Sequence, residues 1–242
     1  MLAMTDNGHI FIGPDIDTDV LLDIIIELNY TEEFCVAQSF SSKFIAELMY
    51  SGFLVMSTTN ESKNKFILLP KHHLIRSVLF FDDLHIGKTA KRLIKRDAPE
   101  YDLFVNRDYD EIIKRCVAHH GEDWLTKPLL KSIQRIRHNG TALVQPCSFG
   151  LYRNGVLCAG EFGVKVGAVY TSYSGYHDET SSGTIQMILL AQYLQKNGFA
   201  FWDLGMPLDY KYTLGAHDID IKEFVSIFRA GRRLPCGGSL TA

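Results

Sequence analysis

The amino-acid sequence predicts a mixed α+β fold. Three features of its second half carry this prediction: a strand hairpin centred on Asn154-Gly155, a long amphipathic helix over residues 180–196, and a continuously apolar strand over residues 199–202. Hairpin strands followed by a helix that returns to a further buried strand indicate a mixed sheet flanked by helices.

The composition indicates a soluble globular chain with a sizeable core. Of its 242 residues, 46% are hydrophobic and 22% are charged, which excludes a disordered chain and fits one large domain or two small ones. Lys and Arg number 25 against 28 Asp and Glu, so the formal net charge is −3. A polyanion would therefore have to be bound by a local basic patch.

A polar run at residues 57–65 marks the first clear shift in composition. It separates the apolar runs 52–56 and 66–69 and predicts a loop, of the kind that connects the strands of a long hairpin. We therefore expect a small N-terminal α/β domain over residues 1–70 and a larger domain over residues 71–242.

Membrane, secretory and metal-binding classes find little support in the sequence. The apolar run at residues 20–26 is interrupted by Asp23 and is far shorter than the ~20 residues of a membrane span. No secretory signal pattern is present, so we expect a cytoplasmic location. The histidine pairs 72–73 and 119–120 lack the spacing of metal ligands, and we expect no metal. No C-x-x-C pair occurs, so we expect free, mostly buried thiols at Cys35, Cys116, Cys147, Cys158 and Cys236.

The larger domain is predicted to begin with one strand and three helices. Residues 76–81 predict a strand, and residues 87–96 predict a short helix that ends before Pro99. Apolar side chains at helical spacing predict a second helix over residues 108–118. A third helix is expected over residues 128–139, because it starts with proline and stops at Asn-Gly.

Strands dominate the next segment of the chain. Residues 142–144 and 147–152 are expected to lead through the turn 153–155 into a strand over residues 156–164, and residues 165–173 to continue the sheet. With the helix and apolar strand that follow, the order is that of an N-acyltransferase (GNAT-like) sheet, and it also fits other α+β folds.

Five cations lie on one face of the short helix predicted at residues 87–96. They recur at i, i+3, i+4, i+7 and i+8, and they are Lys88, Lys91, Arg92, Lys95 and Arg96. Such a stripe repels itself unless an anion neutralises it, and a row of nucleic-acid phosphates matches its sign and spacing. The alternative is a solvated face with aspartate partners, namely Asp82, Asp83 or Asp97.

Asp203 and Trp124 are the two remaining candidates for chemistry. Asp203 is expected at the C-terminal end of the apolar strand, where α/β sheets usually place chemistry. In a structural role it would accept backbone N–H groups of a neighbouring loop; in a functional role it would steady a cationic or amine-bearing substrate beside an acyl carbonyl. Trp124, before the proline-started helix, fits core packing, base stacking or a substrate pocket.

Four motifs stand in a recognisable order along the chain. They are Leu84-His85-Ile86-Gly87-Lys88-Thr89-Ala90-Lys91-Arg92, Trp124-Leu125-Thr126, Gly160-Glu161-Phe162-Gly163-Val164 and Thr213-Leu214-Gly215-Ala216. In this order and spacing, with Asp203 twelve residues before Gly215, the chain resembles the leucyl/phenylalanyl-tRNA-protein transferase family over residues 76–228. The paired tryptophans that the family carries near Pro70 are absent.

This resemblance implies an acyltransferase-like enzyme that takes aminoacyl-tRNA as donor. It would attach the amino acid to the N-terminal amine of a protein, as in N-degron protein degradation, without coenzyme A or another cofactor. The basic stripe would hold acceptor-stem phosphates, and Asp203 would work at the reaction centre. The pocket for the aminoacyl group would be formed around Trp124, Glu161, Tyr170, Tyr173, Gly175, Met187, Leu190, Trp202 and Gly205.

Four of these positions depart from the family pattern. Gly205 replaces a glutamine proposed to assist proton removal, and Tyr173 and Gly175 replace a glutamate and a pocket methionine. Glu161 replaces an apolar residue of the pocket strand. We hypothesise that Glu161, with Gly175 making room, favours a polar or cationic aminoacyl group, because an unpaired buried carboxylate is costly. The alternatives are an outward-facing Glu161 and, for the loss at Gly205, a relative that binds tRNA or peptide without catalysis.

Overall fold

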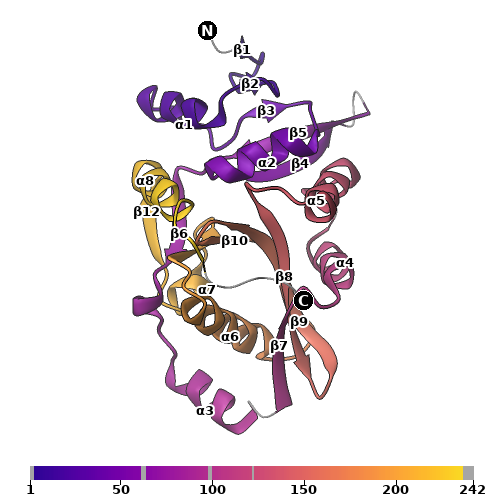
Figure 1. Ribbon diagram of the computed structural model, residues 1–242, viewed down its shortest axis with the longest axis vertical. Helices are drawn as coiled ribbons and strands as arrows, with labels where there is room; N and C mark the ends of the chain where they lie inside the picture. Colours follow the sequence, from indigo (N-terminus) through magenta and orange to yellow (C-terminus); the bar gives the residue numbers. More distant parts are fainter. Residues whose placement is uncertain (1–2, 61–63, 98–99, 122, 237–242) are drawn as a thin grey trace.

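The structure is a computed structural model that describes residues 3–60, 64–97, 100–121 and 123–236. These residues form two sheets (Figure 1). A smaller sheet has the strand order β1-β2-β3-β5-β4, and a larger mixed sheet has the order β12-β6-β11-β10-β9-β8-β7. The predicted α+β class is therefore confirmed.

The N-terminal segment of the chain builds the smaller sheet and two helices. Its elements are β1 (Ala3–Met4), β2 (Ile10–Ile12), α1 (Thr18–Glu27), β3 (Val36–Ala37), α2 (Ser42–Ser51), β4 (Leu54–Asn60) and β5 (Lys65–Lys71). The side chain of Asp17 caps the start of α1, and that of Ser41 caps α2. Helix α2 ends at Gly52, whose φ of 102° is a left-handed conformation that favours glycine.

The predicted loop at residues 57–65 is largely wrong. Its two ends are strand, because β4 pairs with β5 antiparallel from Leu54 opposite Lys71 to Asn60 opposite Lys65. The hairpin connection is correct, but residues 61–63 lie outside the described residues. Polar side chains do not prevent a backbone ladder, and Ser57 donates its hydroxyl to the carbonyl of Trp124.

The rest of the chain builds the larger sheet and its helices. These elements are β6 (Ile75–Leu79), η2 (Phe81–Asp83), α3 (Lys88–Asp97), β7 (Tyr101–Val105), α4 (Tyr109–His120), α5 (Lys127–Asn139), β8 (Gln145–Arg153), β9 (Val156–Val166), β10 (Val169–His177), α6 (Ser182–Lys196), β11 (Phe201–Gly205), α7 (Asp209–Tyr212), β12 (His217–Asp220) and α8 (Ile221–Gly231). The four helices predicted from the sequence correspond to α3, α4, α5 and α6. The hairpin between β8 and β9 turns at Asn154 and Gly155, both at positive φ.

Three strand predictions in this segment need correction. The strand predicted over residues 199–202 is instead β11, which starts at Phe201 and ends at Gly205. Residues 142–144 form no strand, and β8 starts at Gln145. The strand predicted to run through residues 165–173 instead breaks at Gly167, where β9 ends and β10 begins. Gly167 has a φ of 57°, and a side chain there would collide with the backbone of Arg232. A lone glycine gave too weak a turn signal to locate this break.

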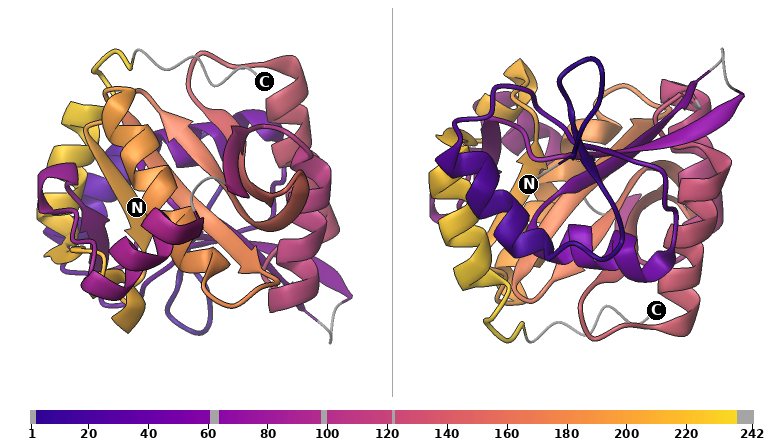
Figure 2. Two further views of the ribbon diagram at one scale, coloured as in Figure 1. Left: turned by 90° about the horizontal axis from the view of Figure 1, so that it is seen from below. Right: turned by 90° about the horizontal axis from the view of Figure 1, so that it is seen from above.

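Helices cover both faces of the larger sheet. Helix α6 lies on one face, over a core that includes Leu79, Tyr170 and Trp202. Helices α4 and α5 lie on the other face (Figure 2). Phe162 and Val164 belong to the core on that face. Successive residues of a strand therefore point to different helix layers.

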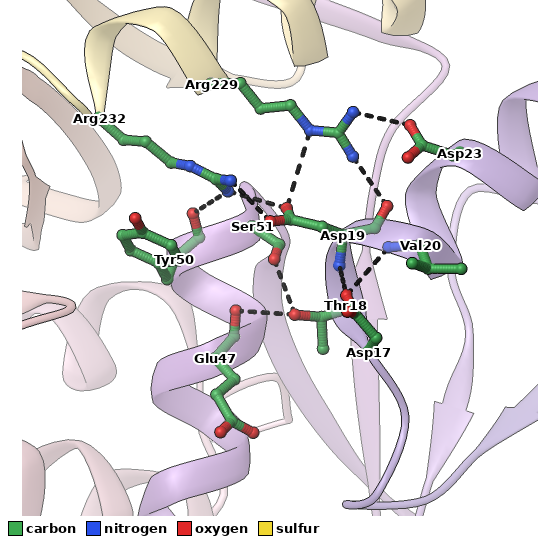
Figure 3. Close-up of polar contacts among 10 residues, drawn as sticks. All are labelled: Asp17, Thr18, Asp19, Val20, Asp23, Glu47, Tyr50, Ser51, Arg229 and Arg232. Carbon is green, nitrogen blue, oxygen red and sulfur yellow. Dashed lines mark hydrogen bonds and ion pairs between the residues drawn. The ribbon is translucent and has the colours of Figure 1, made fainter.

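Salt bridges join the first helix to the last (Figure 3). Arg232 donates to both carboxylate oxygens of Asp19, at 2.8 and 2.6 Å, and Arg229 donates to Asp23 at 2.7 Å. Burial raises the pKa of Asp19, but the hydrogen bonds and charge of Arg232 outweigh it and hold the pKa below its ordinary value. These contacts fix α1 against α8.

The larger sheet follows the smaller one closely along the chain. Lys71 ends β5 and Ile75 begins β6, while Pro70 lies within β5. The division into a domain of residues 1–70 and a domain of residues 71–242 stays a prediction. The prediction of free thiols is confirmed: all five cysteines are unpaired, and only Cys236 is not fully buried.

Candidate active site

The candidate site lies where two parallel strands stop pairing. Strand β10 pairs with β11 from Val169 opposite Phe201 to Thr171 opposite Asp203, and not beyond. From there β10 continues against β9 and β11 continues against β6, each with a shift in register. Helix α6 makes the connection between the two strands. Such a divergence leaves backbone groups and side chains available to a ligand.

Asp203 is fully buried at this divergence, in the middle of β11 rather than at its end. Its carboxylate accepts hydrogen bonds from the Thr171 hydroxyl at 2.9 Å and from the Gly205 N–H at 3.0 Å. The guanidinium Nε of Arg76 lies 3.5 Å away. The structural role considered from the sequence is thus partly realised by one backbone N–H, with a buried cation added.

Arg76 was not identified by sequence reasoning. Its side chain is fully buried, stacks over the ring of Phe224 at 4.2 Å and donates to the Gly52 carbonyl. Among the described residues, its Nη1 has no hydrogen-bond partner. The pair with Asp203 therefore retains a donor that a bound group can use. A charged residue inside a predicted apolar strand was the available signal, since such residues are rarely buried unless paired.

Glu161 is buried and faces α6, so the outward-facing alternative is wrong. Its carboxylate accepts hydrogen bonds from the hydroxyls of Tyr170 at 2.9 Å and Ser172 at 2.6 Å, and from the Gln186 amide at 3.2 Å. Ser172 in turn accepts a hydrogen bond from the Trp202 indole. Burial is the largest influence on Glu161 and raises its pKa above the ordinary value.

Asp203 and Glu161 lie on opposite faces of the sheet. Asp203 pairs with Thr171, whereas its chain neighbour Trp202 pairs with Tyr170, which belongs to the Glu161 group. On the α6 side, Leu190 is buried in the same core and Met187 packs at its edge. The structure thus divides the sequence-predicted site into two groups that meet back to back.

Trp124 and Tyr173 belong to the face opposite α6. Trp124 stacks on Phe162 with ring centroids 6.3 Å apart, and Phe162 contacts Tyr173 at 6.0 Å. The Tyr173 hydroxyl accepts a hydrogen bond from the backbone of Val55, in β4. Both aromatic residues pack against the main core, as the core-packing interpretation of Trp124 requires. Their roles in a pocket stay predictions.

Gly175 and Gly205 occupy positions where a side chain is restricted. Gly175 pairs with Glu161 across the strands, and a Cβ on it would lie 3.2 Å from the Glu161 Cβ. Gly205 has a φ of 77°, and a Cβ on it would approach Leu54 at 3.3 Å. The backbone at Gly205 therefore has a conformation that glutamine would adopt only under strain.

Lys211 is a second residue that sequence reasoning missed. It lies in the short helix α7, yet its side chain is only 4% exposed. Its Nζ donates to the carbonyls of Leu204 and Met206, both at 2.6 Å. Burial lowers the pKa of Lys211 to about 8, although Asp203 and Glu161 raise it. The polar sequence around Lys211 resembles a solvated turn, so no local signal marked it.

The basic stripe of α3 is exposed. Its apolar side, Ala90, Leu93 and Ile94, packs toward the body of the protein. The other face exposes Lys88, Lys91, Arg92, Lys95 and Arg96. Of the aspartates considered as partners, Asp83 contacts His217 instead. Helix α3 lies at the end of the molecule farthest from the smaller sheet (Figure 1).

Neither a metal site nor a membrane span emerges from the described residues. Within them, no cluster of three or more His, Cys, Asp and Glu side chains is arranged to hold a metal ion. No helix in that part of the chain has the length and apolar character needed to cross a bilayer.

With the site defined, sequence comparison assigns the chain to a class of transferases. The family model described as leucyl/phenylalanyl-tRNA protein transferase matches residues 78–229, and the chain belongs to this family. A transferase of this name from Azotobacter vinelandii is 26% identical over 152 residues, covering 62% of this chain and 65% of the relative. One from Flavobacterium johnsoniae is 25% identical over 159 residues, covering 64% of this chain and 72% of the relative.

Solved structures provide more distant likenesses. The C-terminal domain of a putative lysylphosphatidylglycerol synthetase from Agrobacterium fabrum aligns with a TM-score of 0.40 and 11% identity, covering 88% of this chain and 69% of that chain. A structure titled L-PGS from Bacillus licheniformis aligns with a TM-score of 0.38 and 13% identity, covering 78% and 57%. At these TM-scores the likenesses support no argument about this chain.

Proposed function

We propose that this chain transfers an amino acid from aminoacyl-tRNA to the N-terminal amine of a protein, within a GNAT-like domain. Family membership supports this reaction class. The proposal places the reaction in N-degron protein degradation in the cytoplasm. The observation that carries the proposal is the Asp203–Arg76 pair, buried where β10 and β11 stop pairing. No coenzyme or metal is required.

The reaction needs a correctly positioned amine more than it needs the chemistry of a cofactor. The acceptor α-amine has a pKa of ~7.7–8.0 and is largely protonated at neutral pH. Asp203 would hold that amine by accepting a hydrogen bond, and the Nη1 donor of Arg76, which has no hydrogen-bond partner among the described residues, would bind the ester carbonyl as negative charge develops. Conversion of an ester to an amide is downhill, so orientation supplies most of the catalysis.

The exposed stripe on α3 would bind the acceptor stem of the donor tRNA. Apart from Arg96, its cations make no ion pair with a described residue, so they remain free to neutralise phosphates. Replacing Lys91 and Lys95 with glutamate should weaken tRNA binding and reduce its dependence on salt. Lys131→Glu, at an exposed position on α5, is the matched control. Equal binding by both variants would remove α3 from the interface.

We propose further that the Glu161 pocket selects a polar or cationic aminoacyl group rather than leucine. Each hydrogen bond to Glu161 among the described residues comes from a neutral donor. A cationic substrate group would add the missing countercharge. Glu161→Gln keeps the shape of this pocket and Glu161→Leu restores an apolar residue, so their amino-acid preferences should move away from cations. Unchanged preference in both variants would refute this specificity.

An alternative is a relative that binds tRNA or peptide without catalysis. Gly205 favours it, because the family glutamine is absent from this position. The two functions differ in one measurement, which is transfer of amino acid to a peptide after tRNA has bound.

The deciding experiment measures transfer from a full set of aminoacyl-tRNAs to peptides with different N-terminal residues. The best comparison variant is Asp203→Asn, since Asp203→Ala would leave Arg76 as an unpaired buried cation. Transfer of one amino acid by the wild type and its loss in the folded Asn variant would support the transferase. Binding of tRNA without transfer from any donor would support the alternative.

A further inference from the structure

Lys211 is a buried amine whose Nζ makes two hydrogen bonds among the described residues and lies 5.7 Å from the centre of the Tyr210 ring, which leaves its third position without a hydrogen bond there. Two N–H groups point to the carbonyls of Leu204 and Met206, which flank Gly205 on either side. An amine has three hydrogens when charged, and two hydrogens with a lone pair when neutral. Both carbonyl contacts are therefore compatible with either protonation state, and the third position can give or receive a proton.

The charged groups around Lys211 belong to several strands of the larger sheet. They are Asp203, Glu161, Arg76 and Asp218, with His73 in the link before β6. The charges of Asp203 and Glu161 thus raise the pKa of Lys211, and the charge of Arg76 lowers it. Because its pKa is about 8, Lys211 is close in proton affinity to the α-amine of an acceptor protein, and a proton passes between matched groups with little cost.

We propose that Lys211, whose amine is bound to the carbonyls on both sides of Gly205, two residues from Asp203, is the proton-transfer group of the reaction. This inference rests on the proposed function for the reaction itself. As the acceptor nitrogen forms its bond to the ester carbonyl carbon, neutral Lys211 accepts a proton from that nitrogen. Lys211 then returns the proton to the ribose oxygen as the carbon–oxygen bond of the ester breaks. The lysine ends each cycle neutral, and no other reactant is needed.

A purely structural role makes a different set of predictions. A lysine that only ties the two carbonyls around Gly205 together would matter for folding and for substrate affinity. It would leave the pH dependence of the transfer step unchanged. The pH profile therefore separates proton transfer from structural support.

The test compares Lys211→Arg and Lys211→Ala with wild type. Arginine retains the charge and donors but does not deprotonate in this range. We expect each variant to lose about 10²-fold or more in kcat with a smaller change in KM. With an acceptor amine whose pKa lies well below 7, so that the acceptor does not titrate in this range, the rise of kcat with pH near the lysine pKa in the wild type should be absent in both variants. Small primary amines should restore part of the activity of Lys211→Ala.

A control and a direct titration complete the experiment. Lys196→Arg, at an exposed position in α6, should behave as wild type. Heteronuclear NMR of lysine side-chain nitrogens in the full chain should show one resonance, absent in Lys211→Arg, that titrates near pH 8. A titration at the ordinary lysine value, or a variant with the wild-type pH profile, would overturn the inference alone. Failure of the wild type to transfer from any aminoacyl-tRNA would overturn the proposed function, and the catalytic role with it.

Discussion

Two buried carboxylates lie back to back in the larger sheet, and their surroundings differ in charge. Asp203 has a guanidinium partner from β6, whereas Glu161 has only neutral hydrogen-bond donors. An ion pair between two strands is part of the folded framework, because either charge alone is costly. A carboxylate among neutral donors leaves the countercharge to a ligand. Carboxylates on two strands of one sheet, β9 and β11, can thus differ in what balances their charge.

The largest effect should follow removal of the Asp203 carboxylate. Asp203→Ala leaves Arg76 buried without its partner and should lower the free energy of unfolding by about 3–5 kcal/mol. Asp203→Asn keeps a hydrogen-bonding group opposite Thr171 and should lower it less. Urea unfolding followed by circular dichroism measures both. A loss under about 1 kcal/mol in the Ala variant would mean that Asp203 and Arg76 do not depend on each other as a buried ion pair.

A smaller loss is expected when a glutamine is placed at position 205. Gly205→Gln places a side chain at a φ of 77° and beside Leu54, so it should lower the free energy of unfolding by about 1–2 kcal/mol. Because the backbone at this position differs from an ordinary strand, the variant should not transfer amino acids faster. Calorimetry and the transfer assay give the two results. Faster transfer at unchanged stability would show that position 205 lacks only a glutamine side chain and that its backbone conformation is no obstacle.

The pair between Asp19 and Arg232 offers a second Asp–Arg contact that is less buried. Asp19→Asn should lower the free energy of unfolding by about 1 kcal/mol at pH 7. Since the pKa of Asp19 is lower in the folded state, its contribution is present above the ordinary aspartate value of 3.8 and is lost as the pH falls through the folded value. Urea unfolding at pH 7 and below pH 3.8 should show the variant and wild type converging. If the difference in free energy of unfolding between the variant and the wild type grew toward low pH, Asp19 would not be stabilised as an anion.

The smallest effect on stability is expected for Glu161→Gln. The pKa of Glu161 is raised in the folded protein, so the wild type loses stability as the pH rises from 4.5 through the folded value. Glutamine does not ionise, and the variant should be as stable as the wild type at pH 7 or more stable, within about 1 kcal/mol. Thermal unfolding at pH 4.5 and pH 7 measures the difference. A variant that loses more stability at pH 7 than at pH 4.5 would mean that Glu161 is stabilised as an anion.

Local sequence signals identified four helices, α3 to α6, and two hairpins of this fold, but not helices α1, α2, α7 and α8. Apolar spacing located α4 and α6, and the Asn-Gly turn located the hairpin between β8 and β9. The polar strand ends of β4 and β5 and the short strands β7 and β12 were missed. Those strands are held by pairing with partners elsewhere in the chain, and propensity within a short window does not report such pairing.

The sequence by itself determined the family and the α+β class, and it singled out Asp203, Glu161 and the basic stripe as candidates. Only the tertiary structure decided that Arg76 partners Asp203, that Glu161 belongs to the opposite face, and that Lys211 is buried beside Gly205. The physical reason is that motifs and periodicity are local properties of the chain. The charge that a carboxylate or amine meets is decided by which distant strands pair and by which face each side chain takes.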